Sequence, residues 1–384
     1  MNMDEPFEQG PIRPPSEANS LLLRLTRNCP WNRCAFCRSY KDARFSLRGF
    51  EDIRHDIDNM AAIADRLRTL SVREGEKGRI SEEIIRMVWD HHPFYGEYER
   101  TLAMWLYYGG ESVFLQDADS LVMKTDDVIT ILQYLRRTFP SIRRITTYCR
   151  SHTAARKSVA ELQGLKEAGL TRIHVGLESG SDRVLKMINK GATAAVHIAA
   201  GTRIKAAGIS LSEYVIPGLG GMDYSRENAS ETARVINEID PDFVRLRTLH
   251  VVQGTPLAEM MQKGVFTPPG DENILREIRE FIYCLTGIGS TVVSDHILNL
   301  LEEVQGKMPD DKERILNAID RYFALSEEKR RIFRLGRRRG LYRNLDDLSA
   351  GQTYQELQET VDYYEKQGKG FADKKISSIM NDYI

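Results

Sequence analysis

The sequence lacks the features that mark several large classes of protein. No stretch of its 384 residues approaches the roughly 18 consecutive apolar residues that a membrane span requires. Neither sign of charge is in clear excess, because the chain has 54 Lys and Arg and 55 Asp and Glu. The resulting net charge of −1 does not favour binding to DNA or to an anionic membrane. Cysteine is scarce, at five, and a chain of 384 residues is too long for a small disulfide scaffold. These absences predict a cytoplasmic protein with no membrane span and no DNA partner.

Hydrophobic residues make up 41% of the chain, enough to bury a sizeable core, and the length allows one large domain or two ordinary ones. Short β-branched or apolar runs alternate with helical patterns. The predicted strands cover residues 21–25, 112–116, 144–148, 173–177, 211–216 and 243–248. Because strand–helix–strand connections are right-handed, this series predicts an α/β fold. We expect an open, partial six-stranded parallel (β/α)6 barrel, similar to a triosephosphate isomerase (TIM) barrel.

Three further regions flank or interrupt the predicted barrel, which spans residues 21–256. An extended, proline-rich lead occupies residues 1–20, and a helical insertion occupies about 50–110, which is longer than one connecting helix needs. Beyond Pro269 the strand signal fades, and a helical C-terminal extension is predicted over 257–384. Its expected helices cover 275–286, 295–305, 311–325 and 354–367. The basic run 334–339 is interpreted as a solvated charged turn rather than a phosphate contact.

Three of the five cysteines, Cys29, Cys34 and Cys37, crowd into nine residues. Three thiolates in one loop leave one iron of a [4Fe-4S] cluster without a protein ligand, because such a cluster has four iron atoms to ligate. A structural zinc site needs a fourth ligand, and the nearest histidine, His55, lies beyond a helical stretch. An iron–sulfur cluster is therefore favoured over zinc or three unrelated thiols.

The segment TRNCPWNRCAFC (26–37), which follows an apolar strand, resembles the cluster loop of the radical S-adenosylmethionine (SAM) superfamily. The resemblance implies that Cys29, Cys34 and Cys37 hold an oxygen-sensitive [4Fe-4S] cluster whose open iron is chelated by SAM. It also implies that one electron from the cluster cleaves SAM to a 5′-deoxyadenosyl radical, and that an external donor such as flavodoxin or ferredoxin supplies electrons. Four residues separate the first two cysteines where the family most often has three, an addition that a turn at Pro30 and Asn32 accommodates.

A second resemblance covers GLESGSDRVLKMINKG (176–191) and RIKAAGISLSEYVIPGLGG (203–221). These segments are similar to the subgroup that contains oxygen-independent coproporphyrinogen oxidase, the Elongator catalytic subunit and the tRNA methylthiotransferases. The resemblance implies that Glu178 contacts the ribose or methionine part of SAM, that Lys190 meets its carboxylate, and that the backbone of Phe36 meets the adenine. From the residues alone, Lys190 is better explained as an ordinary lysine at a helix end, and Phe36 as packing under its loop.

The superfamily resemblance also implies a residue that binds the amino group of SAM at the carboxyl end of the second strand. The triplet Gly109-Gly110-Glu111 resembles the family's segment, but it precedes the strand 112–116 and is interpreted as a turn. Asp117 lies at the correct end, where a carboxylate bonds an ammonium group, so Asp117 is the candidate. Asp119 is the second choice and is equally suited to capping the following turn.

Alternation within two strands places polar side chains on the inward face of the predicted barrel. The inward positions are Arg172, His174, Gly176 and Glu178 in one strand, and Arg245 and Arg247 in another. A closed TIM barrel fills its interior with branched apolar side chains, so we expect a wetter, open barrel with a ligand channel. His174 is more often a satisfied core histidine than a catalytic one. The two arginines need anions, either an internal carboxylate such as Glu213 or an anionic substrate.

The sequence thus predicts a radical SAM enzyme whose substrate is unidentified, with an anion as one candidate; no catalytic residue is assigned. Cys149 and Cys284 stand alone, and the absence of a second cysteine cluster argues against a methylthiotransferase or a maturase with auxiliary clusters. Two alternatives belong to other classes. One is a haem chaperone or cluster-binding scaffold without turnover, and the other is an RNA-modifying enzyme. The near-neutral charge and the lack of a recognisable RNA module weaken the second of these.

Overall fold

A computed structural model describes residues 7–90, 94–349 and 351–383. Small parts of the predicted lead (1–6), insertion (91–93) and extension (350 and 384) lie outside these described residues. The chain divides into two compact units, and each is described by itself. The first comprises Met1–Asn32, Ser39–Val175 and Ala200–Leu211, and the second comprises Arg33–Arg38, Gly176–Ala199 and Ser212–Ile384.

Eight strands of the described chain form one mostly parallel sheet in the order β1-β4-β5-β6-β7-β8-β9-β10. Their bounds are β1 (Leu21–Arg24), β4 (Ser112–Gln116), β5 (Arg144–Cys149), β6 (Leu170–Glu178), β7 (Ser210–Val215), β8 (Phe243–Leu246), β9 (Thr291–Val293) and β10 (Gly306–Lys307). A separate antiparallel pair is formed by β2 (Thr26–Arg27) and β3 (Ser46–Leu47). The predicted α/β alternation is confirmed, and all six predicted strands are present.

The sheet has two strands more than the six that the sequence predicts. β9 pairs in parallel with β8, and β10 pairs antiparallel with β9. These strands contain three and two residues, too few to show the alternation of apolar and polar positions by which a strand is identified. Strand structure therefore continues past Pro269, into the region for which only helices were predicted.

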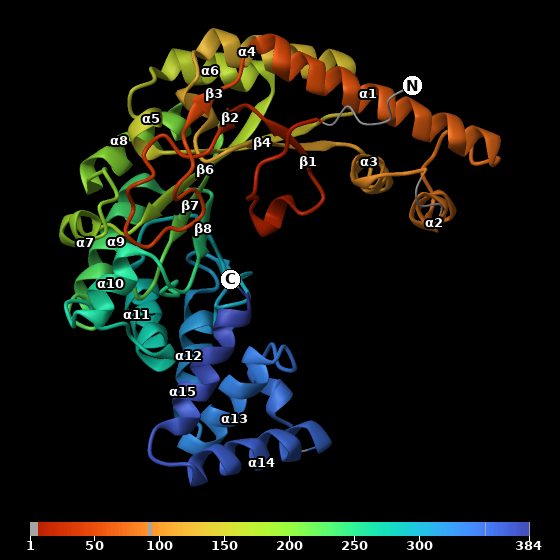
Figure 1. Cartoon of the computed structure of the whole chain (residues 1–384). Helices are drawn as coiled ribbons and strands as arrows, with labels where there is room; N and C mark the ends of the chain where they lie inside the picture. The colour runs from red at the N-terminus through yellow and green to blue at the C-terminus, as the bar shows by residue number, and fades with distance from the viewer. Residues whose placement is uncertain (1–6, 91–93, 350, 384) are drawn as a thin grey trace. The chain divides into compact units, whose positions relative to one another are not determined.

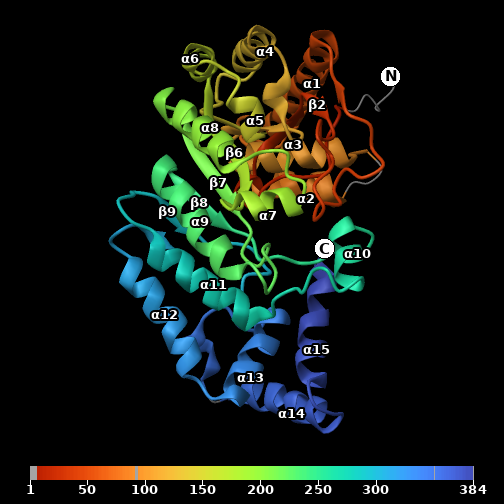
Figure 2. The ribbon, with the colours of Figure 1, turned by 90° about the vertical axis from the view of Figure 1, so that its left-hand side faces the viewer.

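In the first unit, helices α1, α4 and α6 lie side by side (Figures 1 and 2). The helices of this unit are α1 (Phe50–Arg73), α2 (Glu82–Asp90), α3 (Glu97–Tyr107), α4 (Thr125–Thr138), α5 (Ser151–Ala154) and α6 (Val159–Ala168). The predicted insertion contains α1, α2 and α3, of which α3 packs against both others. A capping box opens α6, because Ser158 Oγ accepts from the backbone N of Glu161 at 3.2 Å while Glu161 Oε2 accepts from Ser158 N at 2.8 Å.

In the second unit, α11 packs against α9 and α12, and α13, α14 and α15 pack together (Figure 2). The helices of this unit are α7 (Asp182–Met187), α9 (Ser225–Ile239), α10 (Pro256–Gln262), α11 (Asp271–Cys284), α12 (Lys312–Ala324), α13 (Glu327–Arg338), α14 (Gln352–Lys366) and α15 (Phe371–Ser378). Helix α8 (Ala194–Ala206) begins in this unit and ends in the first. Among the described residues, no helix combines the length and the apolar character that crossing a membrane requires.

Two predictions for the C-terminal region are wrong. The expected helix over 295–305 is absent, and the side chain of Asn299 explains why. Asn299 accepts from the backbone N of Thr248 and donates to the backbone O of Leu246, both at 3.0 Å, so this segment bonds to the end of β8 instead of coiling on itself.

The basic run 334–339 is likewise not a solvated turn, because most of it forms the end of α13. Arg337 and Arg338 have only 2% and 1% of their surface exposed. Arg338 pairs with Asp271 at 2.6 Å, and Arg337 pairs with Glu302 at 2.9 Å. These charges are buried because each has an internal carboxylate, which no local sequence pattern reveals.

Candidate functional site

The first cysteine lies in the first unit, in a turn shaped by two asparagines. Asn28 and Asn32 have φ angles of +68° and +45°, in the left-handed region that asparagine adopts more readily than most side chains. The Asn32 side chain donates to the carbonyl oxygens of Tyr40 and Ala43, and its backbone N donates to Cys29 Sγ at 3.4 Å. The turn expected at Asn32 is therefore present, and it gives Cys29 a hydrogen-bond donor that suits a thiolate.

Trp31, in the same turn, lies against the segment that follows β5. The ring centroid of Trp31 is 5.1 Å from the guanidinium carbon of Arg150, a cation–π contact. Asp119 accepts from the backbone N of Arg150 at 3.2 Å and from Thr153 Oγ1 at 2.6 Å. Burial raises the pKa of Asp119 to about 6, although both bonds oppose the increase. Asp119 thus fixes the turn after β5 within the first unit.

Cys34 and Cys37 belong to the second unit, where hydrogen bonds fix the backbone between them. The backbone N of Ala35 donates to the O of Ile188 at 2.7 Å, and the O of Ala35 accepts from Leu257 N at 3.0 Å. The side chain of Phe36 packs against a hydrophobic cluster formed by Ala35, Val184, Ile188, Leu219, Leu249, Leu257 and Phe266. Phe36 therefore packs under its loop, as its sequence position suggested.

The three cysteines of this segment supply a donor set rather than a formed metal site. None of the five cysteines, all within the described residues, forms a disulfide, and these three are partly exposed. Over the described ranges, no group of three or more His, Cys, Asp or Glu side chains stands close enough to hold a metal ion. Metal binding is coupled to the local folding of its ligands, so three thiols on one short segment do not have to stand together without the metal. Three thiols within nine residues fit a [4Fe-4S] cluster with one iron left for another ligand.

Asp117, directly after β4 in the first unit, is completely buried and bonded by several donors. Arg24 donates to Oδ2 from Nε at 2.8 Å and from Nη2 at 2.5 Å, and the backbone N of Asn28 donates to the same oxygen at 2.9 Å. The Tyr40 hydroxyl donates to Oδ1 at 3.3 Å, and burial together with the charge of Asp117 raises the pKa of Tyr40. A Cβ at Gly10 would lie 2.0 Å from Oδ1, so only glycine allows the lead to pass here. Asp117 thus ties the start of the cysteine segment to the end of β4.

Glu178 and Lys190 form an ion pair in the second unit. Glu178 ends β6 with a φ of +65°, a left-handed conformation that costs a non-glycine residue energy and persists where surrounding contacts hold it. Its Oε1 accepts from Lys190 Nζ at 2.8 Å, and the two side chains keep 13% and 10% of their surface exposed. Gly176 leaves room for the pair, because a Cβ there would lie 2.2 Å from Glu178 Oε1 and 3.0 Å from Lys190 Nζ.

The backbone of Lys190 explains how it reaches Glu178. Lys190 lies between the helices α7 and α8. Its backbone N donates to the O of Leu185 at 3.0 Å, and the flanking Asn189 and Gly191 have φ angles of +52° and +69°. This is how a helix ends in a left-handed turn. The backbone of Lys190 therefore has the conformation expected just after the end of a helix, and its side chain contacts Glu178.

Glu277, on α11, joins both segments of the second unit that carry the family resemblance. Its Oε1 accepts from Gly218 N at 2.8 Å and from Asn228 Nδ2 at 2.7 Å, and its Oε2 accepts from Ser225 Oγ at 2.5 Å. Asn228 Oδ1 in turn accepts from Ser179 Oγ at 2.5 Å, directly after the strand that carries the ion pair. Burial raises the pKa of Glu277 although these bonds oppose it. Sequence reasoning missed this residue, because it lies 59 residues beyond Gly218 in a helix that carries no motif.

Arg245 and Arg247 share one internal carboxylate, which is Asp295 and not Glu213. Arg245 Nη1 contacts Asp295 Oδ2, and Arg247 Nη1 contacts Asp295 Oδ1, both at 2.7 Å. The register of β7 and β8 explains the difference, because Arg245 is aligned with Tyr214 and Glu213 is aligned with Val244. Glu213 therefore lies on the other face of its strand.

Glu213 is completely buried, and neither carboxylate oxygen has a hydrogen-bond partner in the described part of the chain. Burial raises the pKa of Glu213 well above its ordinary value, and the charge of Glu178 adds to the increase while Lys190 opposes it. Its proximity to the ion pair was not expected from the sequence.

His174 is a buried residue of the first unit, as its sequence context suggested. Its Nε2 lies 3.4 Å from Glu17 Oε1, and its ring contacts those of Phe114 and Tyr148 at centroid distances of 6.4 and 5.9 Å. Glu17 also accepts from Arg144 and from Ser20 Oγ, the latter at 2.7 Å. This contact network stabilises the core.

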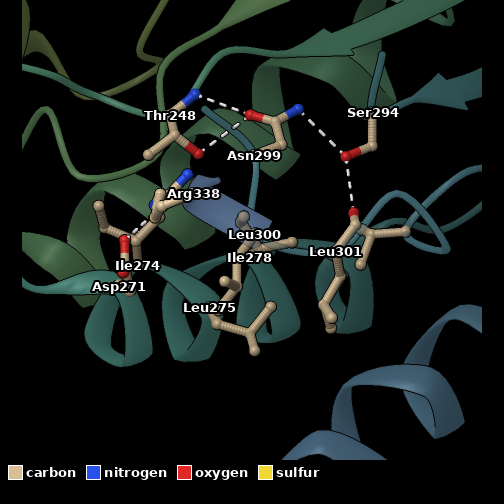
Figure 3. Close-up of a pocket in the computed structure, with 11 residues that line it drawn as sticks. Thr248, Asp271, Ile274, Leu275, Ile278, Ser294, Asn299, Leu300, Leu301 and Arg338 are labelled. Atoms are coloured by element: carbon tan, nitrogen blue, oxygen red, sulfur yellow. Dashed lines mark hydrogen bonds and ion pairs between the residues drawn. The ribbon is translucent and has the colours of Figure 1, made fainter. Parts of the chain in front are cut away.

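A small cavity in the second unit has no room for a substrate. Figure 3 shows it between α11 and the segment 294–301, next to the Arg338–Asp271 pair. Its volume of about 10 Å³ holds roughly one water molecule. Asn299 Nδ2 donates to Ser294 Oγ at 3.1 Å beside it. The cavity is therefore part of the packing rather than a binding site.

Comparisons with known proteins agree with these features. The family model of the Radical SAM superfamily matches residues 23–233, more than half of the chain. The tRNA uridine(34) acetyltransferase of Methanocaldococcus infernus is 27% identical over 122 residues, which are 32% of this chain and 23% of that protein. The uncharacterized protein YtqA of Bacillus subtilis is 25% identical over 103 residues, 27% of this chain and 31% of that protein.

Among solved structures, the archaeal Methanocaldococcus infernus Elp3 with an N-terminal deletion aligns with a TM-score of 0.43 and 17% identity. The alignment covers 62% of this chain and 61% of that one. The chain spans about a quarter of the length of the curated acetyltransferases that it matches.

Proposed function

Because the chain belongs to the radical SAM superfamily of enzymes, we propose that it cleaves SAM reductively and starts radical chemistry on a substrate. The observation that carries this proposal is the Glu178–Lys190 pair at 2.8 Å, held over Gly176. SAM carries an ammonium, a carboxylate and two ribose hydroxyls. A partly exposed carboxylate next to an ammonium group matches both kinds of charge.

Cys29, Cys34 and Cys37 would hold the [4Fe-4S] cluster that the superfamily uses. When bound, the cluster supplies one electron to the sulfonium of SAM and leaves an iron to be chelated by the amino and carboxylate groups of SAM. The residues around Cys29 support this role, because Asn32 donates to its sulfur and Asp117 holds Asn28 in place. An external protein such as flavodoxin or ferredoxin would deliver the electron.

Four residues would hold SAM in this proposal. Lys190 exchanges Glu178 for the carboxylate of SAM, and Glu178 then accepts from a ribose hydroxyl or from the methionine ammonium. Asp117 would bond the amino group through Oδ1, and because its side chain is completely buried, this requires the lead at Gly10 and the Tyr40 hydroxyl to move away from that oxygen. The backbone of Phe36, oriented by the packing of its ring, contacts the adenine.

The test is anaerobic reconstitution with iron and sulfide, followed by reduction with dithionite or flavodoxin in the presence of SAM. We expect one [4Fe-4S] cluster per chain and formation of 5′-deoxyadenosine. Both are lost in the Cys29→Ala, Cys34→Ala and Cys37→Ala variants and kept in the Cys284→Ala control. Recovery of zinc and no iron contradicts the proposal. Formation of S-adenosylhomocysteine alone indicates methyl transfer instead of reductive cleavage.

A second candidate function is RNA modification, favoured by the similarity to tRNA uridine(34) acetyltransferases. It predicts that purified tRNA accelerates SAM cleavage and that a nucleoside product appears in the digested RNA. An unchanged rate with tRNA excludes it. Binding of porphyrin without any SAM cleavage supports the haem-chaperone alternative.

A further inference from the structure

We propose that Arg245, Arg247 and Asp295 form a subsite for an oxyanion, a carboxylate or a phosphate group carried by the substrate. The assignment of this anion to the substrate rests on the proposed function, whereas the site itself lies entirely within the second unit. Arg245 belongs to β8, Arg247 directly follows it, and Asp295 lies just past β9. The carboxyl ends of parallel strands are where ligands bind in α/β folds.

The charges of the cluster do not balance. Asp295 bridges the two guanidinium groups, with one oxygen 2.7 Å from each, so two positive charges share one negative charge. The side chains of Arg245 and Arg247 are only 6% and 14% exposed. Burial and the charge of Arg247 together lower the pKa of His296 to about 4, so this neighbour is neutral at pH 7 and does not change the balance.

One donor of the cluster has no acceptor. Arg247 Nη1 donates to Asp295 and to the backbone O of Leu246 at 2.9 Å. Arg247 Nη2 is buried and has no hydrogen-bond partner in the described residues. Arg245, in contrast, also donates from Nε to Ser212 Oγ at 3.1 Å. A buried charged donor without an acceptor is costly, and an oxyanion that binds two donors of one guanidinium removes that cost.

Other buried arginines of the chain also leave a donor without a hydrogen-bond partner, but their charges balance. The donors without a hydrogen-bond partner in the described residues are Arg48 Nε, Arg337 Nη2 and Arg338 Nε. Asp56 lies 2.5 Å from Arg48, Asp271 lies 2.6 Å from Arg338 and Glu302 lies 2.9 Å from Arg337, so each guanidinium has a carboxylate of its own. Arg245 and Arg247 share a single carboxylate in the described chain, and this charge imbalance sets them apart.

Solvent reaches the cluster at Asp295 and at the edge of Arg247. The side chain of Asp295 is 31% exposed, and Arg247 retains partial exposure beside it. The rings of Tyr214 and Phe243 lie 4.8 and 5.6 Å from the guanidinium carbons of Arg247 and Arg245 and hold them in place. An arriving oxyanion therefore meets preoriented guanidinium groups, for which it competes with Asp295.

This competition distinguishes the proposal from a purely structural ion pair. We would titrate the reconstituted full-length protein, kept anaerobic and without reductant, with inorganic phosphate and separately with acetate and malonate, using isothermal calorimetry. We expect saturable binding of at least one probe, roughly tenfold or more weaker in Arg247→Met. Asp295→Asn removes the competing carboxylate and is expected to bind the same probe several-fold more tightly. The exposed Arg234→Met on α9 is the matched control and keeps the parent affinity.

Phosphate binding without acetate or malonate binding identifies a phosphate-bearing ligand, and the reverse identifies a carboxylate. If neither the parent nor Asp295→Asn binds any probe, or if binding is unchanged in Arg247→Met, the subsite does not exist. If Arg247→Met does not fold, the Asp295→Asn titration alone decides.

A competition experiment with SAM tests which molecule carries the anion. If SAM displaces the probe and Arg247→Met lowers the affinity for SAM to the same extent as that for the probe, the guanidinium holds the SAM carboxylate and the substrate assignment is overturned. Anion binding in a protein that does not cleave SAM under any of these conditions would contradict the proposed function but would still support the anion-binding site.

Discussion

At the scale of single residues, Glu178 and Lys190 form a mostly buried ion pair. Lys190 Nζ and Glu178 Oε1 are 2.8 Å apart, and the side chains of Glu178 and Lys190 are only 13% and 10% exposed. Removing one member of such a pair leaves the other charge buried without its partner, which lowers the stability of the fold. A role in SAM binding must therefore be separated from this structural effect by measuring SAM affinity in a folded variant.

The Lys190→Met variant tests this directly. We expect SAM affinity to fall roughly tenfold or more, because a charge-assisted bond to the carboxylate is lost, while the cluster is retained. The measurement is equilibrium dialysis with SAM on the reconstituted protein. The exposed Lys186→Met on α7 is the control. Equal SAM affinity in the two variants would return Lys190 to the role of an ordinary helix-end lysine.

The Gly176→Ala variant tests the space beneath the pair. An added Cβ would stand 2.2 Å from Glu178 Oε1, so the carboxylate must move. Overpacking of this kind typically costs about 1–3 kcal/mol of unfolding free energy. We expect weaker SAM binding and a lower melting temperature than in Gly289→Ala, where the nearest atom to a Cβ is Lys307 Nζ at 3.8 Å. Equal SAM affinity and equal melting temperature in Gly176→Ala and Gly289→Ala would show that the Glu178–Lys190 pair moves aside without cost.

At the scale of elements, α11 positions the two loops that carry the subgroup resemblance. Glu277 bonds the Gly218 backbone in one loop, and Asn228 passes this contact to Ser179 in the other. A helix of the predicted C-terminal extension is thus part of the support of the Glu178 strand end. The predicted boundary at residue 256 does not separate supporting residues from the loops they hold.

Replacing Glu277 by Gln keeps the shape of the side chain but replaces one carboxylate oxygen by an NH2 group, which cannot accept the hydrogen bonds that this oxygen receives. We expect the free energy of unfolding to fall by about 1–3 kcal/mol, because at least one buried donor loses its acceptor. We also expect SAM to bind more weakly, because the segment after Glu178 loosens. Urea unfolding and dialysis with SAM measure the two effects, with Glu280→Gln on the same helix as control. Lower stability with unchanged SAM affinity would limit Glu277 to a structural role.

The elements that sequence reasoning identified are those with long or repeated patterns. The six predicted strands are present because each shows several β-branched or apolar residues between helical patterns. β9 and β10 are too short for such a pattern, and the predicted helix over 295–305 is absent because Asn299 bonds the end of β8. Tertiary hydrogen bonds that override local propensity are invisible in a single sequence.

At the scale of the whole molecule, the net charge of −1 conceals many buried ionic groups. The sequence placed Cys29, Glu178 and Lys190 on candidate loops because motifs mark them. It did not identify Asp295, which lies 48 residues beyond Arg247, because the pairing of distant charges depends on the completed sheet. Motif residues are therefore predictable from sequence, and their partners are not.

One buried carboxylate makes the stability of the protein depend on pH. Burial acts to raise the pKa of Glu17, but hydrogen bonds from His174 and Ser20 and the charge of Arg144 outweigh it and hold the pKa below its ordinary 4.5. A carboxyl with a lowered pKa in the folded state stabilises the fold above the unfolded pKa. This contribution is lost as the pH falls through the folded value.

Glu17→Gln is therefore expected to be less stable than the parent by about 1–3 kcal/mol at pH 7. The difference should stay constant above pH 4.5 and shrink as the pH falls below it. Urea unfolding followed by circular dichroism at pH 7 and at pH 3.5 measures it, with the exposed Glu83→Gln as control. A difference that does not change between these pH values would mean that the charge of Glu17 contributes nothing.

The bonds of Gly10 set an order in which the chain can complete its fold during synthesis. Gly10 N donates to Gln116 Oε1 at 2.8 Å, across 106 residues of sequence. At about 5–20 residues per second, a ribosome needs on the order of ten seconds to add that length. Glu8 meets its partners Arg24 and Arg27 far sooner, since they follow by 16 and 19 residues. The bond of Gly10 is thus completed only after residue 116 has been added, well after Glu8 meets its arginines.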